Sequence, residues 1–262
     1  MNSADEVATQ YKTPVNLDAR ITLHERFSVS KVEWLDWVFG QIDLPPSSRL
    51  LEVGCGTGVL WRHHLPHLPA GWQVVLTDQS AGMLAQSRAN VGQSVQFAFE
   101  QCDVQSLPFA DAEFDGVIAN HMLYHVPDLS RGLAEIHRVL KPGGRLFAAT
   151  NGNGHMVQLH ELVHRFDPQY RATPFRLGFA LENGSALLAL YFAAVELRRY
   201  ESSLRVTERA PLVAYARSMD MVPPGAEAAF EALVAEELRT HGGVIEINKE
   251  TGLFRAVKAG EG

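Results

Sequence analysis

Short apolar runs alternate with amphipathic segments along the first 150 residues of the chain. The apolar runs have the length of buried strands and occupy residues 49–53, 72–78, 95–103, 114–120 and 145–150. Apolar residues at helical spacing fill the intervals between them, as in LSRGLAEIHRVL at 129–140. Because strands that alternate with helices form parallel sheets with right-handed crossovers, the pattern predicts a doubly wound α/β sheet.

The pattern is less regular in the second half of the chain. Two stretches, 151–180 and 205–243, interrupt the remaining strand-like runs, and we expect them to form a helical cap. Between them, AAVELRRYESSLRV has the character of one long strand. Two turns are also expected, because glycine and proline punctuate the pattern there. They are Lys141-Pro142-Gly143-Gly144, before the strand at 145, and Lys249-Glu250-Thr251-Gly252, inside a predicted hairpin.

A glycine-rich loop follows the first predicted strand. Gly54-Cys55-Gly56-Thr57-Gly58 departs from the dinucleotide fingerprint G-x-G-x-x-G, since Val59 stands where glycine or alanine is needed. The loop also lacks the lysine of a nucleoside triphosphate site. A glycine loop alone is weak evidence for any ligand, so the side chains at the neighbouring strand ends decide what it binds.

Carboxylates stand at three successive strands of the predicted sheet. Glu52 lies in the strand before the loop, Asp78 ends the second strand and Asp103 ends the third. Ligands of doubly wound sheets bind beyond the carboxyl ends of the strands, so these groups are expected around one crevice. They would repel a diphosphate and suit a ligand with a ribose, an adenine and a positive centre. Asp78 can accept both ribose hydroxyls, and Asp103 can accept the adenine amino group.

Four segments in order now resemble a known family. LLEVGCGTG, LTDQS, QCDVQSLPFADAEFDGVIANHMLYHV and LAEIHRVLKPGGRLF, which cover about residues 49–150, are similar to the successive motifs of class I S-adenosylmethionine-dependent methyltransferases. GLFRAVK at 252–258 resembles the antiparallel last strand of that fold. The resemblance implies a mostly parallel seven-stranded sheet with an antiparallel last strand and helical cap insertions.

The resemblance also implies a division of the chain and a set of cofactor contacts. Residues 1–48 would close over the cofactor, 49–150 would bind it, and 151–262 would supply the cap and the last strands. Glu52 and the loop would meet the methionine part of S-adenosylmethionine, Asp78 the ribose, and Asp103 the adenine edge. The implied cofactor-binding residues are Tyr11, Arg20, Glu52, Gly54, Cys55, Gly56, Gly58, Asp78, Gln79, Met83, Asp103, Val104 and Asn120.

Candidates for catalysis follow the fourth predicted strand. Methyl transfer from a sulfonium requires that the acceptor be positioned in line, and some acceptors must also lose a proton. His121, Tyr124 and His125 are expected at this point, and a histidine titrates in the range that suits a general base. The alternative is that these side chains cap the crevice without taking part in proton transfer.

The sequence leaves alternatives open for what the protein does with the cofactor. We expect methyl transfer in line to a small-molecule acceptor whose attacking atom, oxygen, nitrogen or carbon, is open. An enzyme of the same fold that uses the cofactor for cyclisation or elimination is one alternative. A non-catalytic module that binds the cofactor is the other.

One histidine motif invites a metal interpretation. His160-Glu161-Leu162-Val163-His164 matches the H-E-x-x-H motif of zinc proteases. No third ligand follows at a typical spacing, so we expect this segment to line the substrate or lie on a surface. His63, His64 and His67 are expected on a polar helix face. We therefore expect no metal.

Composition limits the partners. The net charge is −7 and no tract is basic, so a nucleic acid partner is not expected. No apolar run approaches the roughly 18 residues of a membrane span, and the polar N-terminus lacks a signal-peptide pattern. With two cysteines and no disulfide framework, a cytoplasmic protein is expected. The oligomeric state is left open.

Overall fold

The computed structural model describes residues 14–92, 94–170 and 178–260. The chain forms two compact units, each built from segments that are distant in sequence. Unit 1 draws on the described parts of Met1–Lys31, Asn153–Arg176 and Glu201–Glu250. Unit 2 draws on those of Val32–Gly152, Leu177–Tyr200 and Thr251–Gly262. The functional division at residues 48 and 150 stays a prediction.

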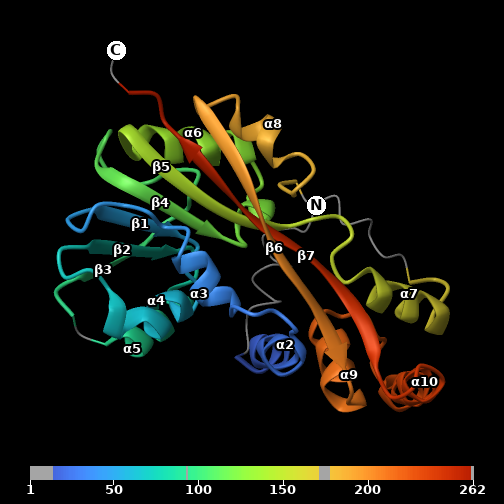
Figure 1. Cartoon of the computed structure of the whole chain (residues 1–262). Helices are drawn as coiled ribbons and strands as arrows, with labels where there is room; N and C mark the ends of the chain where they lie inside the picture. Colours follow the sequence, from blue (N-terminus) through green and yellow to red (C-terminus); the bar gives the residue numbers. More distant parts are fainter. Residues whose placement is uncertain (1–13, 93, 171–177, 261–262) are drawn as a thin grey trace. The chain divides into compact units, whose positions relative to one another are not determined.

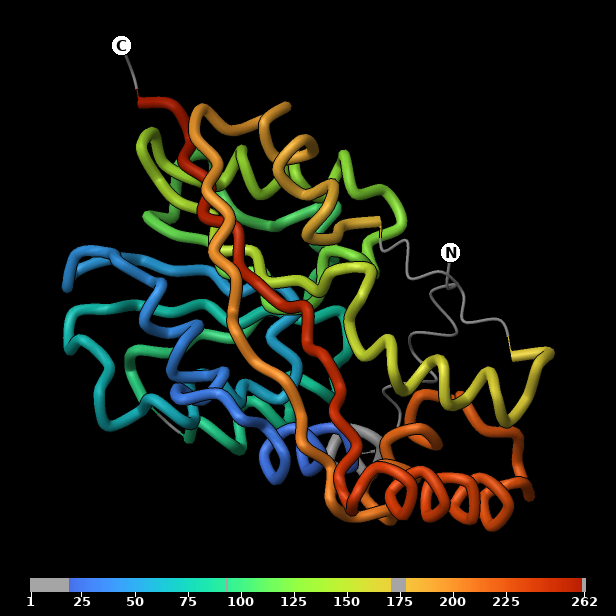
Figure 2. Tube along the Cα trace, turned by 45° about the vertical axis from the view of Figure 1, so that its right-hand side comes forward, coloured from blue at the N-terminus to red at the C-terminus, as the bar shows by residue number. Residues whose placement is uncertain are grey.

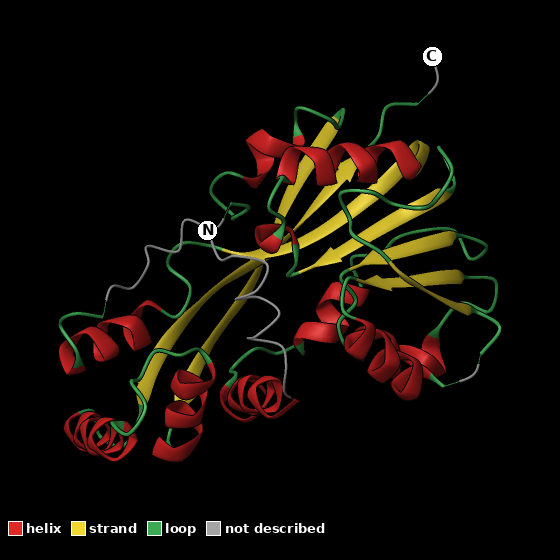
Figure 3. Cartoon of the chain, turned by 180° about the vertical axis from the view of Figure 1, so that it is seen from behind, coloured by secondary structure: helices red, strands yellow, loops and turns green. Residues whose placement is uncertain are grey.

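Seven strands form one sheet in the order β3-β2-β1-β4-β5-β7-β6 (Figures 1 and 3). β1 pairs in parallel with β2 and β4, while β3 and β5 extend the parallel set on either side. β7 pairs antiparallel with β5. The expected fold class is therefore confirmed. The strands are β1 (Arg49–Val53), β2 (Gln73–Asp78), β3 (Phe97–Gln101), β4 (Phe114–Asn120), β5 (Leu140–Asn151), β6 (Ala194–Val206) and β7 (Ile245–Val257).

Helices cover both faces of the sheet in unit 2 (Figure 1). Side chains alternate along a strand, so the neighbours Phe147 and Ala148 enter different cores. The core of Ala148 includes α6 and α8, and the core of Phe147 includes α3, α4 and α5. These elements, with two 3₁₀ turns, are α3 (Trp34–Phe39), α4 (Val59–His64), η1 (Leu65–His67), α5 (Ala81–Val91), η2 (Leu123–His125), α6 (Leu129–Val139) and α8 (Gly184–Leu188).

The described part of unit 1 contains four helices, together with the parts of β6 and β7 that belong to it. Each of these helices contributes to one apolar core, for example through Leu159 and Phe230, and β7 contributes Ile247. Figure 2 shows β6 and β7 running side by side, as the strand order requires. In the part of the chain that the structure describes, no helix is both long and apolar enough to cross a membrane. The helices are α2 (Pro14–Phe27), α7 (Val157–Phe166), α9 (Arg209–Ser218) and α10 (Glu227–Thr240).

Both expected turns are wrong, because the residues concerned lie inside strands. β7 runs without interruption through the predicted hairpin. A Cβ atom on Gly252 would lie 2.6 Å from the carbonyl oxygen of Arg198, so this glycine permits close approach of the neighbouring strand. Lys141–Gly144 lies within β5, whose register against β4 shifts between Phe114 and Gly116. A bulge of this kind absorbs the extra residues without a chain reversal.

Candidate functional site

The glycine loop joins the buried end of β1 to the first turn of α4. Gly54, Gly56 and Gly58 all have left-handed backbones, with φ of 64°, 55° and 68°. Only glycine adopts this conformation without steric cost. A Cβ atom on Gly58 would lie 2.4 Å from the hydroxyl of Ser87, whereas one on Gly56 would meet no described atom within 4 Å. The backbone at Gly56 is therefore open to a ligand.

Glu52 is buried beneath this loop, at 2 % exposure. Burial raises the pKa of Glu52 to about 8, a hydrogen bond from Trp61 Nε1 opposes the rise, and the nearby Asp78 adds to it. An ionised carboxylate at this depth is costly unless a cation or further donors meet it. Glu52 thus provides a buried site that favours a positively charged ligand group.

Asp78 ends β2 and binds the glycine loop directly. Its Oδ2 atom accepts a hydrogen bond from the Gly56 amide at 2.9 Å, and its Oδ1 atom accepts one from the Ser80 amide at 2.8 Å. Burial raises the pKa of Asp78, and these backbone hydrogen bonds oppose the rise. The Gln79 backbone also hydrogen-bonds to Asp78. A carboxylate has about four lone-pair sites, so at least one is left for a further donor, such as a ligand hydroxyl.

Asp103 lies two residues beyond β3. The Gln105 amide donates to Oδ1 at 2.9 Å, and the Gln105 side chain donates to Oδ1 and Oδ2 at 3.1 and 2.9 Å. One lone-pair site on Oδ2 is left for another donor. Burial raises the pKa of Cys102 to about 11, and both Asp103 and Asp78 add to the rise. The two carboxylates therefore lie near the same thiol.

The remaining residues of unit 2 that are predicted to contact the cofactor lie near these strand ends. Gln79 is exposed directly after β2, Met83 is half-buried in the first turn of α5, and Val104 is buried after Asp103. Asn120 ends β4, and its Oδ1 atom is buried without a hydrogen-bond donor among the described residues. A buried acceptor left in that state costs roughly 1–3 kcal/mol, so it suits a donor from a ligand.

The three catalytic candidates lie in one short segment after β4. His121 has φ of 52°, a left-handed backbone that is unfavourable for a residue with a Cβ atom. Strain of this kind gathers at functional sites and persists where the surroundings impose it. The His121 amide donates to the Ala149 carbonyl oxygen at 3.1 Å. Tyr124 and His125 follow in η2, with ring centroids 4.5 Å apart.

An aromatic cluster beside His121 was missed by the sequence analysis. The ring of Trp34 lies 5.2 Å from that of His121, and the Tyr200 ring lies 5.1 Å from Trp34. Trp37 stacks on Trp34 at 5.4 Å. The signal was present in WLDW, which holds two of the four tryptophans of the chain. The contact with Tyr200 depends on packing between segments that are distant in sequence.

Other predicted residues lie elsewhere. Tyr11 falls outside the described residues. Arg20 belongs to unit 1, where its guanidinium donates to the hydroxyl and carbonyl oxygens of Ser218. In the H-E-x-x-H segment, His160 pairs with the Tyr170 hydroxyl at 3.0 Å and His164 with the Tyr170 carbonyl oxygen at 3.1 Å. One ring nitrogen of each histidine is therefore paired with Tyr170.

Comparisons with known proteins give matches over part of the chain. A family model described as "Methyltransferase domain" matches residues 51–148. Malonyl-[acyl-carrier protein] O-methyltransferase of Pseudescherichia vulneris is 32% identical over 128 residues, which cover 49% of this chain and 49% of that protein. Demethylmenaquinone methyltransferase of Symbiobacterium thermophilum is 34% identical over 123 residues, or 45% of this chain and 49% of that protein.

The likeness among solved structures extends further along the chain. The [4+2]-cyclase SpnF aligns with a TM-score of 0.60 at 20% sequence identity and covers 98% of this chain and 97% of that one. Identity at this level shows the fold alone. The chain spans about half the length of the curated relatives that it matches. The residues matched by the family model, 51–148, include the glycine loop and the three carboxylates.

Proposed function

We propose that the protein is a class I S-adenosylmethionine-dependent methyltransferase that acts on a small-molecule acceptor, a proposal supported by the match of residues 51–148 to a methyltransferase domain. One observation carries the proposal. Glu52, Asp78 and Asp103 lie at or near the carboxyl ends of three neighbouring strands, and Asp78 binds the amide of Gly56, whose backbone is open. This arrangement suits a cationic adenosyl ligand and disfavours a diphosphate.

The residues present fit the cofactor in chemical terms. Asp78 and Asp103 each have an acceptor site left, which suits a ribose hydroxyl at Asp78 and an amino group at Asp103. The buried Asn120 Oδ1 atom and the Glu52 carboxyl group offer acceptors for the amino end of the methionine part. Gln79, Met83 and Val104 would flank the adenine. Arg20, whose guanidinium binds Ser218 within unit 1, and Tyr11 stay predicted contacts.

S-adenosylmethionine supplies, when bound, a methyl group on a sulfonium that an acceptor can attack in line. The protein's part is to exclude water and fix the acceptor, which accounts for most of the rate in such reactions. His121 would take the acceptor's proton, since its imidazole stands after β4 in a strained backbone beside Trp34. Tyr124 and His125 would hold the segment and contact the acceptor.

The acceptor is proposed only as a class. The named acceptors of the two relatives differ, one being a malonyl group on a carrier protein and the other demethylmenaquinone. A small molecule fits the net charge of −7, which gives no general attraction for nucleic acid. The free thiols of Cys55 and Cys102 are consistent with the reducing cytoplasm, where we place the reaction.

The direct test is product analysis with the pure protein. We would incubate it with methyl-labelled S-adenosylmethionine and a deproteinised microbial metabolite extract, and follow labelled products and S-adenosylhomocysteine. We expect both to accumulate together. Methylthioadenosine, or a new product without S-adenosylhomocysteine, would instead support the non-methylating alternative. Binding without any turnover would support the non-catalytic one.

A variant tests the role of His121. His121→Asn keeps a residue that tolerates a left-handed backbone and removes the base. We expect the turnover rate to fall by about 10²–10⁴-fold, the usual contribution of a general base, while S-adenosylhomocysteine binds as before. His67→Asn, at an exposed position in η1, is the matched control. Undiminished turnover by His121→Asn would show that His121 packs in the site and is not the general base.

A further inference from the structure

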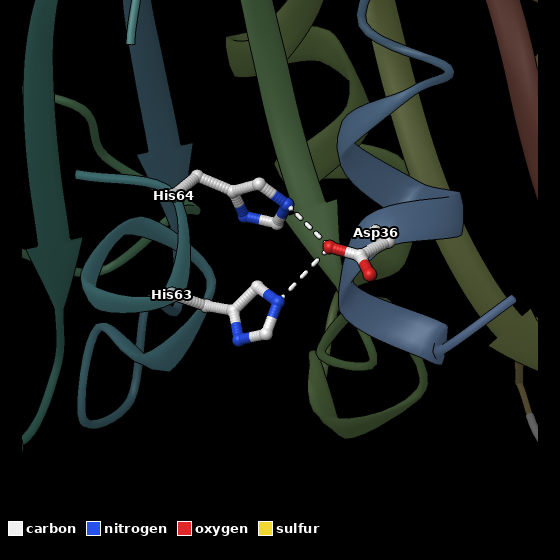
Figure 4. Close-up of side chains that lie close together, drawn as sticks. All are labelled: Asp36, His63 and His64. Atoms are coloured by element: carbon white, nitrogen blue, oxygen red, sulfur yellow. Dashed lines mark hydrogen bonds and ion pairs between the residues drawn. The ribbon is translucent and has the colours of Figure 1, made fainter. Parts of the chain in front are cut away.

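Outside the candidate site, three ligand-bearing side chains converge between α3 and α4 (Figure 4). Asp36 comes from α3, and His63 and His64 are the last two residues of α4. His63 Nε2 lies 2.9 Å from Asp36 Oδ1, and His64 Nε2 lies 3.1 Å from the same oxygen. One ligand atom from each residue lies within 4.8 Å of the other two.

This convergence is unusual for adjacent residues of a helix. Successive side chains on an α-helix point about 100° apart and do not normally face one target. Here both imidazoles turn their Nε2 atoms toward one carboxylate, and their ring centroids are 4.7 Å apart. The sequence analysis expected a polar helix face, which is wrong for His64, because this residue is only 4 % exposed.

The ring of His64 is fixed in place. It stacks on Phe39, with centroids 4.0 Å apart and planes 7° from parallel. Its Nδ1 atom lies 2.8 Å from the Leu60 carbonyl oxygen, an acceptor, so Nδ1 must carry a hydrogen. A neutral imidazole then has only a lone pair on Nε2. That lone pair faces a carboxylate oxygen, another acceptor, so the contact is favourable only when Nε2 carries a proton or a metal ion lies between the two atoms.

We propose that Asp36, His63 and His64 form a binding site for a divalent transition metal, with Zn²⁺ as the ion of choice. Two imidazole nitrogens and one carboxylate oxygen are ligands that Zn²⁺ binds at about 2.0–2.2 Å, and water completes its tetrahedron. The Leu60 carbonyl oxygen supplies the partner that metal-binding histidines almost always have on their second nitrogen. Small movements of the two exposed side chains, Asp36 and His63, would open the space for the ion.

The metal ion would link two short helices. α3 has six residues and α4 has six, and the ion would join the side chains of one to the end of the other. A ligand that binds only the folded protein stabilises it in proportion to its concentration. Zn²⁺ should therefore raise the thermal midpoint of the full chain.

The experiment uses the tag-free full chain after treatment with a chelator. Zn²⁺ would be titrated by competition with a chromophoric chelator, and Co²⁺ would report the coordination number by its visible absorption. We expect one ion per chain and a four-coordinate Co²⁺ spectrum. Asp36→Asn and His63→Asn should each weaken Zn²⁺ binding by at least about tenfold, the lower end for the loss even of a supporting partner. His67→Asn should leave it unchanged.

Other outcomes would overturn the proposal. Absence of stoichiometric binding would do so, as would Zn²⁺ binding that survives in Asp36→Asn and His63→Asn, because the ion would then sit elsewhere. Folding of each variant would be checked by circular dichroism. Both substituted positions have exposed side chains, 49% for Asp36 and 36% for His63, so the variants should fold.

Discussion

Glu52 is a buried acid whose position costs stability in the free protein. Its carboxyl group is buried, and burial raises its pKa to about 8 while Trp61 donates one hydrogen bond to it. An apolar side chain or an amide would cost less at this position in the free protein. The acid is explained if a cationic ligand group meets the ionised form, as the proposed cofactor would.

This predicts a pH dependence of stability that belongs to one residue. The folded pKa lies above the ordinary value of 4.5, so Glu52 binds its proton more tightly in the folded state. Its contribution is therefore full below about pH 4.5 and is lost as the pH rises through about 8. At about 1.4 kcal/mol per pKa unit, ionisation of Glu52 should lower the free energy of unfolding by several kcal/mol.

Glu52→Gln removes this dependence and keeps an acceptor for Trp61. We would measure the free energy of unfolding by urea for wild type and variant, without ligand, at pH 5.5, 7 and 8.5. The variant should gain stability over the wild type as the pH rises. A difference that stays constant across this range would show that Glu52 does not carry the shifted pKa.

At the scale of elements, Gly252 shows why a local signal can mislead. Lys249-Glu250-Thr251-Gly252 has the composition of a turn, yet it lies in β7. The glycine is required by its neighbour, since an added Cβ atom would lie 2.6 Å from the Arg198 carbonyl oxygen. That contact joins residues 54 positions apart in the chain, so no local pattern reports it.

Gly252→Ala should therefore destabilise the protein. Overpacking against a backbone atom typically costs about 1–3 kcal/mol, and the thermal midpoint should fall accordingly. Gly82→Ala is the control, because Gly82 lies in α5 and its added Cβ atom would meet only Ser80 Oγ, at 3.7 Å. This change should be neutral or stabilising, by up to about 1 kcal/mol. Equal stability of the two variants would contradict the close approach.

Elements with strong periodicity were predictable. The expected strands at 49–53 and 114–120 coincide with β1 and β4, and Ser80 caps α5 by accepting a hydrogen bond from the Met83 amide, as expected. Asp78 and Asp103 could be placed because topology brings the carboxyl ends of parallel strands together. The contact of Trp34 with Tyr200 and the burial of His64 were not predictable, because both arise from packing between distant segments.

At the scale of the whole molecule, the family likeness covers only part of the chain. The match to the methyltransferase domain covers residues 51–148, all of which belong to unit 2. Unit 1 has its own apolar core, built on α2, α7, α9 and α10. Since the curated relatives share only about half of this chain, their acceptors do not transfer to it.

The central claim is that the carboxylates at the strand ends receive an adenosyl ligand, and isothermal titration calorimetry tests it most directly. S-adenosylhomocysteine should bind the full chain with one site, while NAD⁺ should not bind. Asp78→Asn should weaken the binding by one to a few kcal/mol, as expected when ligand hydroxyls lose a charged acceptor. Asp111→Asn, at an exposed position before β4, should leave it unchanged. Absence of S-adenosylhomocysteine binding together with clear uptake of NAD⁺ or a flavin nucleotide would contradict the account.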